Sequence, residues 1–369
     1  MTDTLRGVRV LDLTRMLAGP YATMLLADMG AEVIKVEDPA GDPIRRMGPP
    51  FEPDGRSAYF MAVNRNKKSV VLDLRTERDR ERFLRLVETA DAVIDNFRAG
   101  VMEKLRLTPP HLRAAKPDVV TCSLTAFGGD GPYRDQPGFD LVLQAMGGAM
   151  SITGEPGGAP IRSGVPIGDL AGGVFAALAV CAALVKRQRT GEGEHIDLSL
   201  LDVQVSLLTY VAQYHLTDGV VPGPVGSGHQ SVVPYQAFAT ADGHVVVAVF
   251  GENFWAPLCR ALDVEELIGR YPDNATRHTH REEVVACLQR RLLTRTTDEW
   301  VSALRAAGVP SGPVNTLDRV LADPQVRHRG MVATDGERPL LGNPIKTGAP
   351  DAFTPAPALG QHDAELLPP

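Results

Sequence analysis

The stretch VRVLDLTRMLAGPYATMLLADMGAEVIKV at residues 8–36 decides the fold. It begins with a β-rich run, Val8–Leu13, and passes through a Gly-Pro pair at 19–20 into a helical stretch that ends at Met29. A second β-rich run, Glu32–Val36, follows directly. A strand, a helix and a strand at this spacing predict a βαβ unit whose two strands lie parallel in one sheet.

The same alternation continues through the first 200 residues. Further β-rich runs lie at Ser69–Leu72, Ala92–Ile94 and Val119–Leu124, and a helical pattern covers Glu77–Thr89. We therefore expect a mostly parallel α/β sheet. The run Leu170–Val185 is apolar on nearly every face, which predicts a helix inside the core. This run is shorter than the roughly 20 residues that span a bilayer.

The pattern changes after about residue 200. A Gly/Pro-rich connector, LTDGVVPGPVGSG at 216–228, precedes two β-rich runs, Tyr235–Thr240 and His244–Phe250, around an Ala-Asp-Gly turn. This arrangement predicts a β-hairpin. The helical patterns that follow are at 252–262, 281–293 and 297–307. Together they indicate a smaller α+β domain from about residue 229 to 310.

Composition narrows the class of protein. A length of 369 residues favours two domains, and the net charge of −7 with 5% aromatic residues argues against a nucleic-acid partner. The N-terminus lacks the apolar segment of a signal peptide, so we expect a cytoplasmic protein without a membrane partner. The cysteines show no CxxC pair and are expected to be reduced thiols: Cys122, Cys181, Cys259 and Cys287.

Several common catalytic motifs are missing from the sequence. The loop after the first β-rich run has one glycine where a dinucleotide site needs G-x-G-x-x-G, although Glu37 resembles the ribose-binding acid. No P-loop and no G-x-S-x-G elbow is found. The one close histidine pair, His278 and His280, lacks a metal-ligand pattern, so no metal site is expected.

Three features remain as candidates for function. Asp169, in GVPIGD at 164–169, is expected at the N-cap of the apolar helix, where it is either a plain cap or a nucleophile toward an activated acyl group. The basic cluster at 64–68, with Leu72–Arg75 at the end of the same predicted strand, either holds phosphates or forms a solvated loop. Asp95–Arg98 follows another predicted strand, where it either faces a ligand or caps a helix.

Taken together and in order, these segments resemble the class III coenzyme A transferases. The resemblance covers almost the whole chain and is carried by seven segments: VRVLDLTRMLAGPYATMLLADMGAEVIKVE (8–37), NRNKKSVVLDL (64–74), ADAVIDNFRAG (90–100), SGVPIGDLAGG (163–173), VPYQAFATADGHVVVAV (233–249), GVPSGPVNTLDRVLADPQV (308–326) and ALGQH (358–362). The family includes formyl-CoA transferases and carnitine CoA-transferases.

The resemblance implies a set of site residues. Asp169 aligns with the catalytic aspartate of the family. The positions implied for CoA binding are Leu17, Leu72, Asp73, Leu74, Arg75, Asn96, Phe97, Arg98, Lys104, Pro137, Gly138, Phe139 and Asp140. An arginine that helps bind CoA often follows the second strand in the family, but Asp38 stands there in this chain. That contact is either lost or supplied by Arg45 or Arg46.

The resemblance also implies a reaction and leaves alternatives open. A transferase moves CoA between acids through an aspartyl anhydride and an aspartyl–CoA thioester, with CoA as substrate and no tightly bound cofactor. The related α-methylacyl-CoA racemases use a histidine in a Gly-His-Asp segment, whereas this chain has Phe139, which cannot exchange a proton. A non-catalytic CoA-binding protein is a further alternative.

The segment around the hairpin is most similar to the succinyl-CoA-dependent branch, which acts on dicarboxylates. Candidate partners for a distal carboxylate are His229, Gln230 and Arg162. The family further implies an interlocked homodimer of α/β chains. In that arrangement the large Rossmann-like, CoA-binding domain is discontinuous. The predicted boundaries are 1–215 plus 325–369 for the large domain, 229–310 for the small α+β domain, and 216–228 and 311–324 for the linkers.

Overall fold

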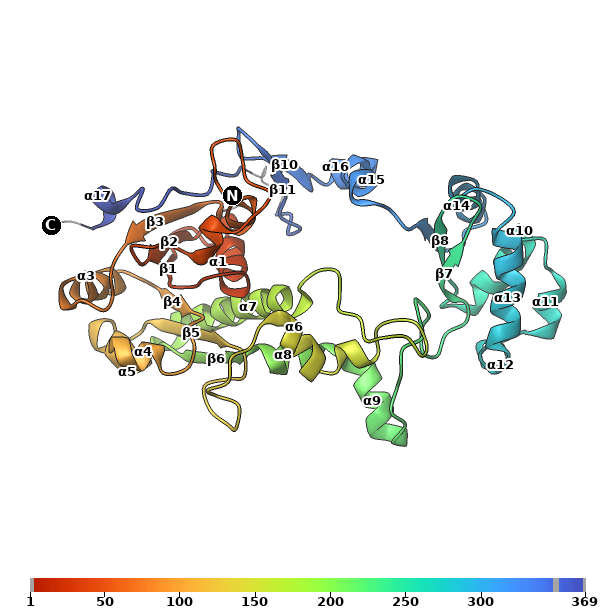
Figure 1. Ribbon diagram of the computed structural model, residues 1–369, viewed down its shortest axis with the longest axis horizontal. Helices are drawn as coiled ribbons and strands as arrows, with labels where there is room; N and C mark the ends of the chain where they lie inside the picture. Colours follow the sequence, from red (N-terminus) through yellow and green to blue (C-terminus); the bar gives the residue numbers. More distant parts are fainter. Residues whose placement is uncertain (1–2, 348–351, 368–369) are drawn as a thin grey trace. The chain divides into compact units, whose positions relative to one another are not determined.

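The computed structural model describes residues 3–347 and 352–367 of the chain. The chain divides into two compact units (Figure 1). The first unit consists of Met1–Met150, Arg162–Val220 and Pro324–Pro369, and the second consists of Ser151–Ile161 and Val221–Asp323. The second unit thus includes an excursion at 151–161 and extends beyond residue 310 to the end of the segment expected as a linker.

A parallel six-stranded sheet forms the centre of the first unit. Its strand order is β3-β2-β1-β4-β5-β6, and every neighbouring pair is parallel. The bounds are β1 Arg9–Asp12, β2 Glu32–Glu37, β3 Lys67–Val71, β4 Ala92–Asp95, β5 Val120–Thr125 and β6 His195–Ser199. This is the doubly wound order, in which ligands bind beyond the carboxyl ends of the strands near the reversal between β1 and β4. The predicted parallel α/β sheet is confirmed.

The strand β6 is absent from the predicted elements, and its surroundings explain why. It is an edge strand with the sequence HIDLS, in which His195 and Asp197 are exposed. A strand that is solvated on one side carries polar residues at alternate positions and lacks the continuous apolar run of a central parallel strand. Five residues of this kind give too weak a pattern to separate from a loop.

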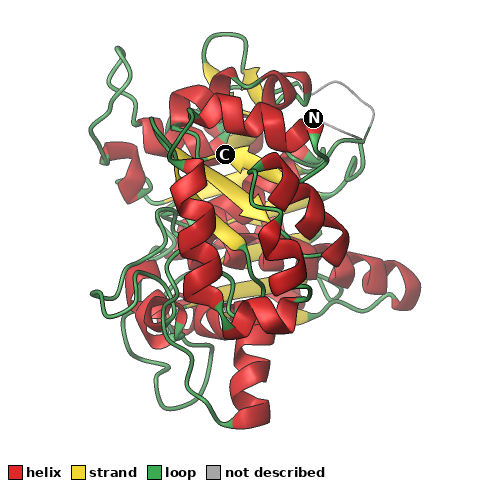
Figure 2. Ribbon diagram, turned by 90° about the vertical axis from the view of Figure 1, so that its right-hand side faces the viewer, coloured by secondary structure: helices red, strands yellow, loops and turns green. Residues whose placement is uncertain are grey.

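Figure 2 colours the helices red, the strands yellow and the loops green. Helices pack against the sheet of the first unit and follow the loops at its strand ends. Their bounds are α1 Ala18–Asp28, α2 Ala58–Asn64, α3 Glu77–Val87, α4 Val101–Leu105, α5 Pro109–Ala115, α6 Asp140–Met146, α7 Ile167–Thr190, α8 Leu200–Leu207, α9 Thr209–Asp218, α16 Pro324–His328 and α17 Asp363–Leu366, with 3-10 turns η1 Pro43–Arg46 and η2 Ala149–Ser151. A short hairpin pairs β10 Val332–Thr334 with β11 Pro339–Leu341.

The C-terminal tail returns to the edge of the central sheet. The backbone N–H of Ser69 donates to His362 Nδ1 over 3.1 Å, and that of Val71 donates to Asp363 Oδ1 over 2.8 Å. These bonds use the exposed edge of β3, which would otherwise leave unpaired backbone groups. The tail therefore completes the sheet on this side.

Helices α1 and α7 pack closely because a glycine lies at their contact. A Cβ atom added at Gly173 would lie 2.7 Å from the carbonyl oxygen of Ala18 in α1, whereas one added at the neighbouring Gly172 would lie 2.2 Å from Leu200 Cδ2 in α8. Buried residues of both helices, among them Ala22 and Ala176, share one core cluster. The small residues let the two helix backbones approach each other above the sheet.

The prediction that the apolar helix is buried on every side is wrong in part. Helix α7 keeps one face outside the core of the chain, and its exposed apolar side chains are Val174, Phe175, Leu178 and Val185. The helix is also longer than the predicted run, and at 24 residues it is long and apolar enough to cross a membrane by length and composition. Core helices of soluble proteins meet the same criterion, so this is weak evidence for a membrane span.

The second unit has its own sheet and core. Its strands β7 Tyr235–Ala239, β8 His244–Ala248 and β9 Ser311–Pro313 form an antiparallel sheet in the order β7-β8-β9, which confirms the predicted hairpin. Its helices are α10 Trp255–Ala261, α11 Glu266–Arg270, α12 Asn274–Thr279, α13 Arg281–Leu292, α14 Thr297–Ala306 and α15 Leu317–Ala322, with a 3-10 turn η3 Glu252–Phe254. Trp255, Trp300 and Phe238 are buried in its core.

The basic cluster at 64–68 is used inside the fold, so it is neither of the two alternatives left open by the sequence, a phosphate site or a solvated loop. Lys67 Nζ lies 3.0 Å from Asp12 Oδ2, and both side chains are fully buried. Arg65 pairs with buried Asp28 over 2.6 Å. Burial lowers the pKa of Lys67 to about 8, although the charge of Asp12 opposes this shift. A buried lysine with such a partner has no free charge for a ligand.

The contact between α1 and α7 gives a first prediction. We expect Gly173→Ala to destabilise the protein, because the new methyl group meets a backbone oxygen that cannot turn aside. Such overpacking costs about 1–3 kcal/mol, more than the helix propensity gained, which is at most about 1 kcal/mol. Urea denaturation followed by circular dichroism measures the free energy of unfolding.

The matched control is Gly269→Ala in α11, where an added Cβ atom meets nothing within 4 Å. This variant should be neutral or more stable by up to about 1 kcal/mol. A Gly173→Ala protein as stable as the wild type would contradict the close contact of the two helices.

Candidate active site

A pocket of about 640 Å³ crosses the carboxyl ends of five strands of the central sheet. Its walls come from the segments that follow β1, β2, β3, β4 and β5, which is where a doubly wound sheet places its ligands. The wall includes the predicted site residues Leu17, Leu72, Asp73, Leu74, Arg75, Asn96, Phe97, Arg98, Gly138, Phe139 and Asp169. Lys104, Pro137 and Asp140 do not line this pocket.

Asp169 does not cap helix α7 as predicted. The N-cap residue is Pro166, and Asp169 lies in the first turn of the helix. Asp140, from the N-terminus of α6, accepts the free amides instead. Its Oδ1 atom receives the backbone N–H of Gly168 over 2.9 Å and that of Asp169 over 3.1 Å. One buried carboxylate thus performs the capping that the sequence assigned to another.

The Asp140 carboxylate is itself held in place by neighbouring groups. Gln144 Nε2 donates to Asp140 Oδ2 over 2.6 Å, and Gln144 Oε1 accepts the backbone N–H of Ser163 over 2.9 Å. Gly168 is required at this point because an added Cβ would lie 2.9 Å from Asp140 Oδ1 and 2.3 Å from Gln204 Nε2. The first turn of α7 is therefore held by the bonds to Asp140 and by close packing against Gln204.

The Asp169 carboxylate is partly buried in the pocket wall and has no local partner. Within residues 3–347 and 352–367, no hydrogen bond or ion pair reaches its oxygens. Burial, together with the nearby charge of Asp140, raises the pKa of Asp169 to about 7. A carboxylate of raised basicity at the edge of a pocket is suited to act as a nucleophile or as a proton carrier near neutral pH.

Arg15 is a pocket residue that the sequence analysis missed. Its guanidinium lies over the ring of Phe97, 5.1 Å from the centroid, and donates to Asp38 Oδ2 over 2.7 Å. All three residues line the pocket. Asp38, which follows β2, thus holds the guanidinium of Arg15 from the β1–α1 loop at the pocket. In the sequence, the one hint of this contact is an unexpected acid after the second strand and an arginine after the first, at the same edge of the predicted sheet.

The two arginines proposed to replace the missing cation do not line this pocket. Arg45 makes a bidentate ion pair with Glu37, with both distances 2.7 Å, and lies over the ring of Phe60. Arg46 is exposed on the 3-10 turn η1. Glu37 has its own buried partner and does not play the part of a ribose-binding acid in this geometry.

Three further arginines lie at the rim of the pocket. Arg98 is exposed, and no side-chain partner reaches it among the described residues. Arg75 pairs with Asp73, and Arg134 pairs with Glu103 over 3.0 Å. Arg134 was also missed, because its loop carries no motif. Guanidinium groups are suited to bind phosphates, so this rim matches a phosphorylated ligand.

The residues expected near a distal carboxylate make local contacts. Gln230 Nε2 donates to the carbonyl oxygen of Gly223 over 3.1 Å, and the ring of His229 packs against Tyr235. Arg162 is exposed in the first unit. His278 Nε2 lies 3.1 Å from the carbonyl oxygen of Gln230. Within residues 3–347 and 352–367, no group of three His, Cys, Asp or Glu side chains is placed to hold a metal ion.

The fold and the site define an α/β protein with an unpartnered carboxylate in an arginine-rimmed pocket, and comparison with known proteins gives its family. Residues 5–363 match CoA-transferase family III. The chain is 43% identical to succinyl-CoA:mesaconate CoA-transferase of Haloarcula hispanica, over 98% of this chain and 95% of that protein. It is 40% identical to succinate–glutarate CoA-transferase of Agrobacterium fabrum, over 98% and 94% of the two chains.

A solved structure agrees with this match. The crystal structure of a CAIB/BAIF family protein from Brucella suis superimposes with a TM-score of 0.89 at 38% identity, and the match covers 99% of this chain and 98% of that one. The chain belongs to CoA-transferase family III and is a CoA-transferase. The family predicted from the ordered motifs is confirmed.

The raised pKa of Asp169 gives a second prediction. Between its ordinary pKa near 3.8 and its folded value of about 7, the unfolded chain ionises this group while the folded protein keeps it protonated. Stability is therefore lost as pH rises through this window. We expect Asp169→Asn to melt at a higher temperature than the wild type at pH 8, with the difference vanishing near pH 4. Calorimetry over this pH range measures it.

Asp202→Asn is a control for removing a carboxylate from a first helical turn of the same unit, since Asp202 occupies that position in α8. Its difference from the wild type gives the effect of losing a first-turn carboxylate that lies outside the pocket wall. A pH-independent effect of Asp169→Asn would contradict the raised pKa.

Proposed function

We propose that this CoA-transferase moves CoA from succinyl-CoA to a dicarboxylic acid, with Asp169 as the covalent nucleophile. The observation that carries the proposal is the unpartnered, partly buried carboxylate in the wall of a pocket rimmed by arginines. The names of the two relatives above support the donor and the class of acceptor. CoA itself is a substrate in this proposal.

The proposed reaction proceeds by acyl exchange at one carboxylate. Asp169 attacks the thioester carbonyl carbon of succinyl-CoA, the C–S bond breaks, and CoA leaves as the thiolate. The thiolate then attacks the aspartyl carbonyl of the resulting anhydride, releases succinate and forms an aspartyl–CoA thioester. Each intermediate keeps an activated acyl bond, so no other energy source is needed.

In the second half of the proposed reaction, the acceptor carboxylate attacks the aspartyl thioester and again releases the thiolate. Attack of the thiolate on the acceptor's acyl carbon gives the new acyl-CoA and restores Asp169. The dipole of α7 favours negative charge near its first turn, because the peptide dipoles of the helix add up to a partial positive charge at this end. The developing oxyanions lie in this region in our proposal.

We propose that CoA lies along the pocket, from the arginine rim to Asp169. Leu72–Arg75 and Asn96–Arg98 are the wall segments after β3 and β4 that would contact it, with Leu17 from the loop after β1. The rim arginines are suited to the phosphates of CoA, and Phe97 offers an apolar face. Lys104, Pro137 and Asp140 lie outside this wall and are left out of the proposal, except that Asp140 positions the nucleophile.

Racemisation at the α-carbon is the alternative reaction for this fold. It needs two groups that exchange protons on opposite faces of the substrate. Phe139, which lines the pocket and is 63% exposed, stands where the resemblance places the partner base, and its ring has no such proton. The transferase reaction therefore fits the pocket better.

We also propose that the protein acts as an interlocked homodimer. The exposed apolar face of α7, with Val174 and Leu178, continues with exposed apolar residues of α6 and α8 such as Leu141 and Val205. A single chain that leaves so many large apolar side chains in water is suited to bury them against a copy of itself. Sedimentation equilibrium of the purified protein tests this assembly: a monomer at micromolar concentration would contradict it.

The third prediction tests the covalent step. We expect incubation with succinyl-CoA followed by hydroxylamine or borohydride to modify the peptide that contains Asp169, as detected by mass spectrometry. Asp169→Ala should abolish CoA transfer from succinyl-CoA to glutarate or mesaconate, because the other carboxylates of the wall are each paired with an arginine: Glu37, Asp38, Asp73 and Asp135. It should still bind CoA, since the rim arginines are unchanged.

The control variant is Asp202→Asn, on the neighbouring helix α8 and outside the pocket wall. This protein should transfer CoA and form the adduct like the wild type. Exchange of CoA that persists in Asp169→Ala would exclude the proposed nucleophile. Deuterium wash-in from solvent at the α-carbon of a 2-methylacyl-CoA would favour racemisation, and CoA binding without any exchange would favour a non-catalytic protein.

A further inference from the structure

The loop between β1 and α1, residues 14–17, is a wall of the pocket with an unusual backbone. Arg15, Met16 and Leu17 line the pocket. Met16 has φ of 68°, a left-handed conformation that residues other than glycine rarely adopt. A residue stays in such a conformation only where its surroundings hold it there. The structure shows which groups hold it.

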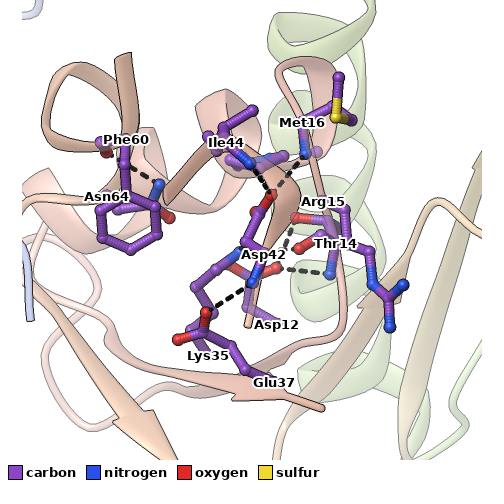
Figure 3. Close-up of polar contacts among 12 residues, drawn as sticks. Asp12, Thr14, Arg15, Met16, Lys35, Glu37, Asp42, Ile44, Phe60 and Asn64 are labelled. Atoms are coloured by element: carbon purple, nitrogen blue, oxygen red, sulfur yellow. Dashed lines mark hydrogen bonds and ion pairs between the residues drawn. The ribbon is translucent and has the colours of Figure 1, made fainter. Parts of the chain in front are cut away.

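A buried ion pair beneath the loop contacts the backbone on both sides of Arg15 (Figure 3). Lys35 Nζ lies 2.9 Å from Asp42 Oδ2 and donates to the carbonyl oxygen of Thr14 over 2.8 Å. Asp42 Oδ1 accepts the backbone N–H of Met16 over 3.3 Å. Lys35 and Asp42 are 0% and 2% exposed, so neither can reach a ligand directly.

Further contacts fix Asp42. Its Oδ1 also accepts the backbone N–H of Ile44 over 3.1 Å, and its own backbone N–H donates to Glu37 Oε2 over 3.0 Å. Ile44 is fully buried in the cluster that contains Leu17. The pair therefore connects the end of β2 and the turn η1 to the pocket loop.

Arg15 lies between the two clamped positions and points away from Asp42 (Figure 3). Its backbone N–H donates to Asn96 Oδ1 over 2.8 Å, and its carbonyl oxygen accepts from Asn96 Nδ2 over 2.7 Å. Its guanidinium is then held over Phe97 and against Asp38 in the pocket wall. The backbone of Arg15 is thus held by Asn96 in the pocket wall, and the backbone of its two neighbours, Thr14 and Met16, is held by the ion pair.

We propose that Lys35 and Asp42 are positioning residues for CoA binding, which act by clamping residues 14–17 so that Arg15 faces an anionic group of CoA. The inference rests on the proposed function, in which CoA occupies this pocket. Lys35 and Asp42 touch neither CoA nor the reacting atoms. The Arg15 side chain is the group through which they act.

Stability alone does not account for the pair. Replacing both members of a buried ion pair by apolar residues of similar size is often neutral or stabilising, whereas removing one member is strongly destabilising. Apolar side chains cannot bond to the carbonyl oxygen of Thr14 or to the N–H of Met16. The specific contribution of the pair is the position of the loop, and this contribution can be separated from stability by experiment.

The fourth prediction uses the double variant Lys35→Met/Asp42→Leu of the full chain. We expect its dissociation constant for CoA, measured by calorimetry, and its KM for succinyl-CoA to rise by about tenfold. This is the size of effect expected when one hydrogen bond to a charged group is lost. The melting temperature should stay near that of the wild type, and kcat should change little, because Asp169 is held by separate contacts. Asp42→Asn, which keeps Oδ1 as an acceptor for Met16, should bind CoA more tightly than Asp42→Leu.

A thermodynamic cycle tests whether the clamp acts through Arg15. Arg15→Ala alone should weaken CoA binding, and adding the double change to Arg15→Ala should weaken it little further, because coupled residues are not additive. The matched control is Arg65→Met/Asp28→Leu, a buried ion pair of the same unit whose two members do not line the pocket. It should leave the dissociation constant for CoA unchanged.

Two results would overturn the inference: wild-type CoA affinity in a folded double variant, or an equal loss of affinity in the Arg65/Asp28 control. Additive losses in the cycle would overturn the role of Arg15. If the double variant does not fold, the comparison of Asp42→Asn with Asp42→Leu gives the same decision. A wild-type protein that transfers CoA while the clamp variants bind normally leaves the proposed function intact, whereas a wild-type protein that does not bind CoA overturns the function itself.

Discussion

The bond from Asp140 to the first turn of α7 is the contact on which the site depends. An α-helix leaves its first four N–H groups without partners, and the side chain of the N-cap residue is their usual local acceptor. Here the N-cap is Pro166, and Asp140 accepts the N–H groups of Gly168 and Asp169. The carboxylate of Asp169 takes no part in capping, and burial together with the charge of Asp140 raises its pKa. As a result, the Asp140 carboxylate has a structural role, and the Asp169 carboxylate remains available for chemistry.

The basic side chains likewise fall into two groups, those that are buried in ion pairs of the fold and those that line the pocket. Lys67 and Arg65 belong to a segment that looks basic and solvated, and Lys35 belongs to a predicted strand. Each of the three is buried against an acid and bonded to the backbone or side chains of the fold. The arginines that remain at the pocket, such as Arg15 and Arg98, lie in loops. A net charge summed over the chain, or over a run of residues, does not separate these two groups, because burial decides which charges a ligand can meet.

The sequence was sufficient for the parallel sheet, the hairpin and the family, because each rests on local periodicity or on motifs in order. It was insufficient where the deciding contact joins distant residues. Asp140 and Asp169 are 29 positions apart, so the cap could not be read from the helix itself. Arg15 and Asp38 meet only because β1 and β2 are neighbours in the sheet. The exposed face of α7 was missed because an apolar pattern does not tell a core from a surface that a partner covers.

Helix α7 combines three tasks that constrain one another. Asp169 lies in its first turn, Gly172 and Gly173 follow and allow the close approach of α8 and α1 respectively, and the exposed apolar face begins at Val174. At 1.5 Å per residue, Val174 lies about 8 Å along the helix axis from Asp169. In the proposed dimer, a partner that covers this face would remove water within that distance and would hold the helix against the sheet. Burial is the main cause of the raised pKa of Asp169, so such a partner would act on the same pKa through a single helix.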